Sequence, residues 1–261
     1  MENAIEVKGL VTHYGDREIL RNISLSIPKG KTTVILGGSG CGKSTLLRHL
    51  IGLLKPTSGS ILINGRDITA MNETELNEVR KKFGMLFQGA ALLNSLSIAD
   101  NVALPVKEHT RLEDSTIQIM VRMKLDLVGL SGFGGFFPSQ LSGGMKKRAG
   151  IARAMALDPE IIFFDEPSAG LDPVTAAGLD ELILKLRDIF KMTIVVVTHE
   201  LLSIFMIADY VIMLDAGSVI FSGTLEELKA SGQPRIKKFL DRQAENEIYN
   251  PEDYLKIIAG E

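Results

Sequence analysis

The chain has 261 residues, of which 45% are hydrophobic, so it is long enough for one large α/β domain or for one domain with subdomains. Its formal net charge of −3 offers no strong basic field, which argues against nucleic acid as the main partner. The single cysteine, Cys41, cannot form an intrachain disulfide and favours a reducing compartment. The N-terminus lacks a signal-peptide pattern and no apolar run reaches about 18 residues, so we expect any membrane role to come through partners.

The first elements are two alternating strands, at residues 5–10 and 23–27, which predict an antiparallel layer beside the core. Tyr14 lies in a turn between them. Its ring is either packed within the turn or available to stack on a planar ligand.

The most specific motif occupies residues 37–44, which read GGSGCGKS and match G-x-x-x-x-G-K-[ST]. A buried strand is predicted just before it and a helix just after it. Backbone N–H groups of such a loop, with the helix N-terminus, bind phosphate oxygens. We therefore expect a nucleoside triphosphate, with Lys43 at its β- and γ-phosphates and Ser44 as a ligand of Mg²⁺. The predicted nucleotide-binding residues are Gly37, Gly38, Ser39, Gly40, Cys41, Gly42, Lys43, Ser44 and Thr45, with Tyr14 stacking on the base.

Cys41 carries a separate expectation because it lies near Lys43 and a helix N-terminus. Both features would lower the pKa of its thiol, which predicts a reactive cysteine that Mg-ATP protects from maleimide. The alternative is a buried, inert thiol.

Gln88 follows a predicted buried strand at residues 83–87, and after it the hydrophobic pattern changes from strand-like to helical. Residues 89–158 have helical spacing, which predicts a helical subdomain inserted into the α/β core. Within it, Ser142, Gly143 and Gly144 open a helix and form a second possible anion site. The alternative is a capped surface helix with a solvated basic face, whose predicted exposed residues are Lys146, Lys147, Arg148 and Arg153.

Two later strands end in chemically active side chains. Residues 161–164 are apolar and lead into Asp165 and Glu166, which predicts acids at the carboxyl end of a parallel strand. Asp165 is expected to hold Mg²⁺, and Glu166 to act as the general base for water. His199 follows a strand at residues 193–198 and is interpreted as a γ-phosphate sensor. The alternatives are a solubility pair of acids and a structural histidine.

The order of these motifs resembles the ATP-binding subunit of ABC transporters over residues 1–225, with residues 226–261 as a C-terminal helical extension. The resemblance implies an α/β P-loop NTPase (RecA-like) core with ATP and Mg²⁺ as ligands. It also implies that Gln88, Lys43, Glu166 and His199 are catalytic, and that Gln88 joins Ser44 and Asp165 at the metal. Two copies are expected to pair head to tail, with each ATP between one copy's residues 37–44 and the other copy's residues 142–144. An integral membrane permease is implied, which places the chain at the cytoplasmic face of the inner membrane.

A narrower resemblance rests on residues 85–92 (MLFQGAAL), 100–103, 108–110 and 141–145, and on the tail at 234–240. Met145 stands where the wider family usually has glutamine. These segments are similar to the Mla-type ATPases, which implies phospholipid trafficking with an MCE lipid-binding protein and a small STAS-domain partner. The alternatives are another importer or exporter, of amino acids or lipoproteins, and a soluble ABC ATPase of translation or DNA repair.

Two surfaces are expected to bind partners. The apolar stretch at residues 89–93, with Leu92 at its centre, is predicted to line a groove for a permease helix. A last short helix with Tyr254, Leu255, Ile257 and Ile258 is predicted to dock on the second copy or on the STAS-domain partner.

Overall fold

The computed structural model describes residues 2–241. It divides into two compact units, Met1–Leu228 and Lys229–Glu261, and the first of these contains the sheets and the candidate site. The predicted last helix at residues 250–258 lies outside the described residues.

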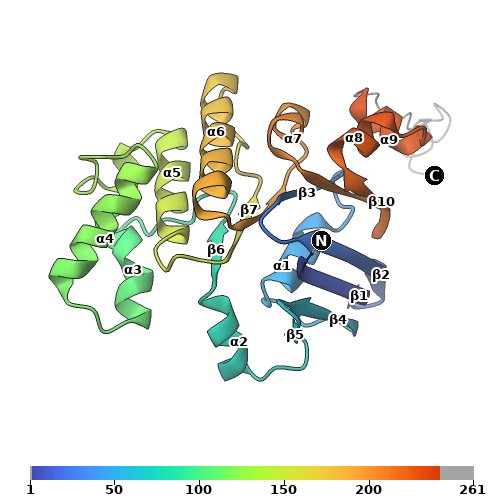
Figure 1. The fold of residues 1–261 in the computed structure, drawn as a ribbon, viewed down its shortest axis with the longest axis horizontal. Helices are drawn as coiled ribbons and strands as arrows, with labels where there is room; N and C mark the ends of the chain where they lie inside the picture. The colour runs from blue at the N-terminus through green and yellow to red at the C-terminus, as the bar shows by residue number, and fades with distance from the viewer. Residues whose placement is uncertain (1, 242–261) are drawn as a thin grey trace, which may run out of the picture. The chain divides into compact units, whose positions relative to one another are not determined.

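A six-stranded sheet forms the core of the first unit (Figure 1). Its strand order is β10-β9-β3-β8-β7-β6, and all neighbours are parallel except the antiparallel pair of β9 and β10. The central strands are buried along their length, as apolar strands covered on both faces should be. The strands are β3 (Thr32–Gly37), β6 (Phe83–Leu86), β7 (Ile161–Asp165), β8 (Thr193–Val197), β9 (Tyr210–Asp215) and β10 (Ser218–Thr224).

A second, antiparallel sheet has the order β2-β1-β4-β5, which confirms the predicted antiparallel layer. Its strands are β1 (Asn3–Tyr14), β2 (Arg17–Pro28), β4 (Ser58–Ile63) and β5 (Arg66–Asp67). Helix α1 (Lys43–Leu50) shares one hydrophobic core with both sheets. Leu46 and Leu50 pack there with Ile5 of the antiparallel sheet and Phe163 of the larger one. The glycine-rich loop is therefore attached to a helix that is held on two sides.

Four helical segments connect β6 to β7 and pack against one another (Figure 1). They are α3 (Ile98–His109), α4 (Asp114–Leu127), the 3₁₀ turn η1 (Pro138–Gln140) and α5 (Gly143–Ala154). Helix α2 (Glu73–Arg80) precedes β6 and starts with a capping box between Asn72 and Glu75.

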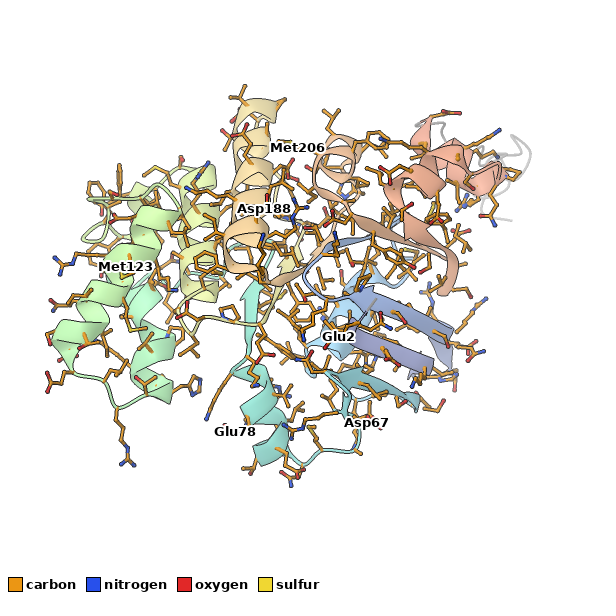
Figure 2. The ribbon with its side chains drawn as sticks, viewed as in Figure 1. Glu2, Asp67, Glu78, Met123, Asp188 and Met206 are labelled. Carbon is orange, nitrogen blue, oxygen red and sulfur yellow. The ribbon has the colours of Figure 1, made fainter. Side chains whose placement is uncertain are left out.

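Two helices follow β7 and β8. Asp172 caps α6 (Pro173–Phe190) by accepting from the N–H groups of Val174 and Thr175. Four apolar residues of α6 are buried, namely Leu179, Leu182, Ile183 and Leu186, whereas Phe190 at its last position is 42% exposed. Helix α7 (Leu201–Ile207) follows β8. Met206 of α7 and Met123 of α4 lie at the surface (Figure 2).

Near the end of the described chain, α8 (Leu225–Ala230) follows β10. Helix α9 (Pro234–Leu240) lies in the second unit. None of the helices among residues 2–241 combines the length and the apolar character needed to cross a membrane.

Candidate active site

The predicted site residues follow four neighbouring parallel strands. Strands β3, β8, β7 and β6 are adjacent, so their carboxyl ends lie at one edge of the sheet. The glycine-rich loop follows β3, His199 follows β8, and Gln88 follows β6. Asp165 ends β7 and Glu166 comes directly after it. The carboxyl edge of a parallel sheet is where α/β folds bind ligands.

Glycine is required at two positions of the loop. Gly37 has φ 152°, and a Cβ there would lie 2.3 Å from the carbonyl oxygen of Leu214 on β9. Gly42 has φ 105° at the N-cap of α1, and a Cβ there would lie 2.7 Å from a methyl group of Leu20 on β2. A side chain at either position would push the loop away from the strand beside it.

The loop presents backbone and cationic groups to a ligand. Gly38, Ser39 and Gly40 are exposed, and Ser44 is exposed in the first turn of α1. No acidic residue lies in that turn, so the positive end of the helix dipole is unopposed. The ammonium of Lys43 donates to the carbonyls of Gly37 and Gly38, both at 2.8 Å. This arrangement can hold a phosphate chain.

The predicted lowering of the pKa of Cys41 is wrong. Its side chain is only 5% exposed and belongs to the hydrophobic core. Burial raises the pKa of the thiol, and this outweighs the lowering by the charge of Lys43. The loop turns this side chain inward, so Cys41 can contribute only its backbone to a ligand.

Glu166 is held in an unusual conformation beside His199. Its φ is 47°, in the left-handed region, and its N–H donates to the carbonyl of Val197 at 2.8 Å. One carboxylate oxygen, Oε1, lies 2.8 Å from Nδ1 of His199, whose side chain is 58% exposed. The other oxygen, Oε2, is buried without a hydrogen-bond partner in the structure. An unpartnered carboxylate oxygen at this edge is suited to accept a proton from water.

Asp165 is a half-buried carboxylate whose pKa is shifted by the charges around it. Burial first, and then the charge of Glu166, raise the pKa of its carboxyl, while Arg48, Lys147 and Lys43 lower it. The residues predicted for Mg²⁺, namely Ser44, Gln88 and Asp165, all offer oxygen atoms, which this ion prefers. Among the described residues no cluster of three or more histidine, cysteine or acidic side chains could hold a metal. One carboxylate fits Mg²⁺, which normally completes its shell with water and substrate phosphates.

Lys147 is a site residue that the sequence interpretation missed. We expected it on an exposed basic face of α5, but it is only 5% exposed. Its ammonium donates to the backbone carbonyl of Gln88 and, at 3.1 Å, to that of Glu166. Apolar residues of α5 recur at helical spacing, and Ile151 lies four positions after Lys147 on the same face. This spacing could have predicted that Lys147 lies on the buried face of α5.

The second predicted anion site is built separately from the first. Ser142 caps α5, with its hydroxyl oxygen accepting from the N–H of Met145 at 3.3 Å. Gly144 packs closely on α6, where a Cβ would lie 2.4 Å from Thr175. Within residues 2–241, no hydrogen bond or ion pair joins residues 142–144 to residues 37–44. Ser142 and Gly143 are exposed, so this helix start faces outward.

Tyr14 and His49 lie on β1 and α1, two elements that are joined by a side-chain hydrogen bond. Tyr14 ends β1 and is 46% exposed, which keeps its ring available for stacking. His49, which the sequence did not single out, is fully buried on α1. Its Nε2 lies 2.7 Å from the hydroxyl of Thr12, and its Nδ1 lies 2.7 Å from the carbonyl of Leu54. It links α1 to the strand that carries Tyr14.

Sequence comparison finds relatives along nearly the whole chain. The family described as ABC transporter matches residues 20–169. The intermembrane phospholipid transport system ATP-binding protein MlaF of Haemophilus influenzae is 45% identical over 260 residues, which cover 98% of both chains. MlaF of Escherichia coli K12 is 42% identical over 94% of this chain and 91% of its own. The probable ribonucleotide transport ATP-binding protein mkl of Mycobacterium leprae is 46% identical over 91% of this chain and 69% of its own.

Solved structures share the fold. One is a dimeric ATP-binding cassette in a post-hydrolysis state with ADP and Pi, at TM-score 0.78 and 32% identity over 85% of this chain and 98% of that one. Another is cbiO1 of Clostridium perfringens, part of an ABC transporter complex, at TM-score 0.82 and 28% identity over 97% and 98% of the two chains. The predicted α/β P-loop fold is therefore confirmed.

Proposed function

Because the chain belongs to the ABC transporter family, we propose that it is the ATP-hydrolysing subunit of a membrane complex that moves phospholipids between envelope membranes. The predicted resemblance to ABC ATP-binding subunits, and within them to the Mla type, is confirmed. The observation that carries the proposal is the 45% identity to MlaF of H. influenzae over 98% of both chains. The mkl relative is about as similar, but this chain spans only 69% of it.

The chain is an ATPase that binds ATP, and its parallel-sheet edge suggests how it works. Lys43 and the N–H groups of residues 37–45 would hold the phosphates, and Tyr14 would stack on adenine. Glu166 would take a proton from the attacking water through Oε2, while His199 orients the carboxylate through Oε1. Gln88 would orient the water from the next strand. Mg²⁺, when bound through Ser44, Asp165 and Gln88, would neutralise phosphate charge.

The same proposal includes a second copy of the chain. The start of α5 at Ser142 and Gly143 is exposed and, among residues 2–241, makes no hydrogen bond or ion pair with the glycine-rich loop of its own copy. A helix N-terminus of this kind binds anions, so it would meet the γ-phosphate held by the other copy. The similar solved cassette with ADP and Pi is described as dimeric, which supports this arrangement.

The remaining partners are proposed from the relatives. Their names place them in transport systems, so we infer a permease, and with it a peripheral position at the cytoplasmic face of the inner membrane. We also infer an MCE lipid-binding protein and a small STAS-domain partner. Leu93, beside the predicted groove residue Leu92, is 44% exposed and is available to a permease helix.

The test of the catalytic assignment is Glu166→Gln. The amide keeps the shape of the side chain but cannot take a proton, so we expect kcat for ATP to fall at least ~100-fold while ATP still binds. Glu181→Gln, on the exposed side of α6, is the matched control and should retain the wild-type rate. Near-normal turnover of Glu166→Gln in the assembled complex would contradict the base assignment.

The substrate is tested by copurification and transfer. The complex should contain phospholipid and move it between labelled vesicles only with hydrolysable ATP. Copurification with an amino-acid permease and a solute-binding protein would overturn the phospholipid proposal and leave the ATPase intact.

A further inference from the structure

Helix α5 starts at the second predicted anion site and reaches the backbone of two segments at the first site. Its Lys147 donates to the carbonyl of Gln88, which follows β6, and to the carbonyl of Glu166, which follows β7. A single buried ammonium therefore joins the two segments that carry the proposed water-orienting and proton-accepting side chains.

A buried cation of this kind is costly unless it is well paired. Burial lowers the pKa of Lys147, whereas the charges of Asp165 and Glu166 raise it. The ammonium lies near those two carboxylates, but within the described residues its hydrogen bonds go to main-chain carbonyls. A neutral side chain could fill the space that Lys147 occupies. The two hydrogen bonds of its ammonium therefore indicate that Lys147 has a specific role at these carbonyls.

A second cation of α5, Arg153, contacts the segment that follows Gln88. The guanidinium of Arg153 donates to the carbonyls of Ala90 and Ala91, at 2.8 and 2.7 Å. Ala90 has φ 60° and Ala91 has φ 48°, both in the left-handed region. Alanine seldom adopts this conformation, and the hydrogen bonds from α5 help to maintain it.

Glu166 lies in the other segment that α5 holds, and its backbone is in the left-handed region as well, with φ 47°. Lys147 is the only one of the two cations that contacts both segments. A displacement of α5 at its N-terminal end, where the second predicted anion site lies, would therefore move the backbones of Gln88 and Glu166 together.

We propose that Lys147 is a positioning residue for ATP hydrolysis, which holds the backbones of Gln88 and Glu166 in one fixed relation so that both side chains face the same phosphate. The inference rests on the proposed roles of Gln88 and Glu166. Its two hydrogen bonds are to main-chain carbonyls, so Lys147 would act by setting the geometry of these two segments.

The experiment compares Lys147→Met with Lys147→Arg in the full-length chain with its copurified membrane partners. Methionine has no N–H group, so we expect kcat to fall about 10- to 100-fold, with KM and the ATP dissociation constant within about threefold of wild type. Arginine reaches at least as far as lysine and has N–H donors for both carbonyls, so it should restore kcat to within about fivefold. The neighbouring Lys146→Met, on the same helix, is the matched control and should behave as wild type.

Several outcomes would overturn the inference. These are an unchanged kcat for Lys147→Met, a loss of ATP affinity that parallels the loss of kcat, or equal losses for methionine and arginine. If Lys147→Met does not fold, Lys147→Ala with the same kcat and affinity measurements replaces it. Glu166→Gln is measured in parallel: an active Glu166→Gln enzyme refutes the proposed role of Glu166 as the base, whereas an inactive one with a normal Lys147→Met enzyme refutes only this inference.

Discussion

Cys41 lies in the phosphate-binding loop but points into the core. Its thiol is 5% exposed and burial raises its pKa, so little thiolate is present and reagents have no direct access. We expect maleimide to label the native protein at least ~100-fold more slowly than the urea-unfolded protein. Mass spectrometry of timed samples measures both rates. Complete labelling of native protein within the unfolded-state time would show that the side chain is accessible.

His49 is buried in a neutral state, and this makes stability depend on pH. Burial lowers its pKa below the usual value, so the folded protein binds this proton more weakly than the unfolded chain does. The stabilisation is therefore complete above about pH 6.5, the unfolded-state pKa, and is lost as pH falls through the lower folded-state pKa.

We expect the free energy of unfolding to decrease as pH falls below about 6.5, and His49→Gln to remove that part of the slope. Urea titrations between pH 5 and pH 8 measure it. His13→Gln, at an exposed position, is the control and should keep the wild-type slope. An identical slope in the His49→Gln variant would show that another group titrates.

At the scale of elements, α5 and the segment after β6 are packed together through Gly150. A Cβ at this position would lie 2.6 Å from a methyl group of Leu86 and 3.3 Å from the Cβ of Ala90. We expect Gly150→Ala to lower the free energy of unfolding by about 1–3 kcal/mol, because overpacking outweighs the better helix propensity of alanine.

The matched control for Gly150→Ala is Gly89→Ala, in the same segment, where a Cβ would meet nothing within 4 Å. Chemical denaturation of both variants gives the comparison. Equal stability of the two variants would mean that α5 can shift without cost.

The strands, the glycine-rich loop and the acids after β7 were predictable because each is a local pattern: buried apolar runs, a fixed motif and strand ends. Lys147 was not predicted, because its charge suggested exposure although its spacing from Ile151 placed it on the buried face. Its partners are backbone carbonyls of distant segments, which no sequence pattern records. The burial of Cys41 likewise depends on the direction in which the loop turns, and the pairing of His49 with Thr12 depends on a long-range contact.

At the scale of the whole molecule, one chain carries a phosphate-binding loop and an outward-facing predicted anion site, and no hydrogen bond or ion pair joins the two within residues 2–241. We expect Glu166→Gln with Mg-ATP to form a dimer that wild type forms only transiently, because unhydrolysed ATP keeps both sites bridged. Sedimentation velocity measures the two species. Adding Ser142→Ala to the Glu166→Gln variant should weaken the dimer, because it alters the start of α5 that is proposed to meet the γ-phosphate of the other copy. Monomers throughout would contradict the head-to-tail arrangement.

The left-handed backbone of Glu166 has a consequence for protein engineering. Holding a non-glycine residue at φ 47° costs on the order of 1–3 kcal/mol, and glycine would relieve that strain. Directed evolution that screens this chain for heat resistance alone will therefore favour replacing the carboxylate, and the most thermostable clones will include inactive ones. A selection scheme that retains turnover must assay ATP hydrolysis in every round, and it should look for gains away from the carboxyl end of β7.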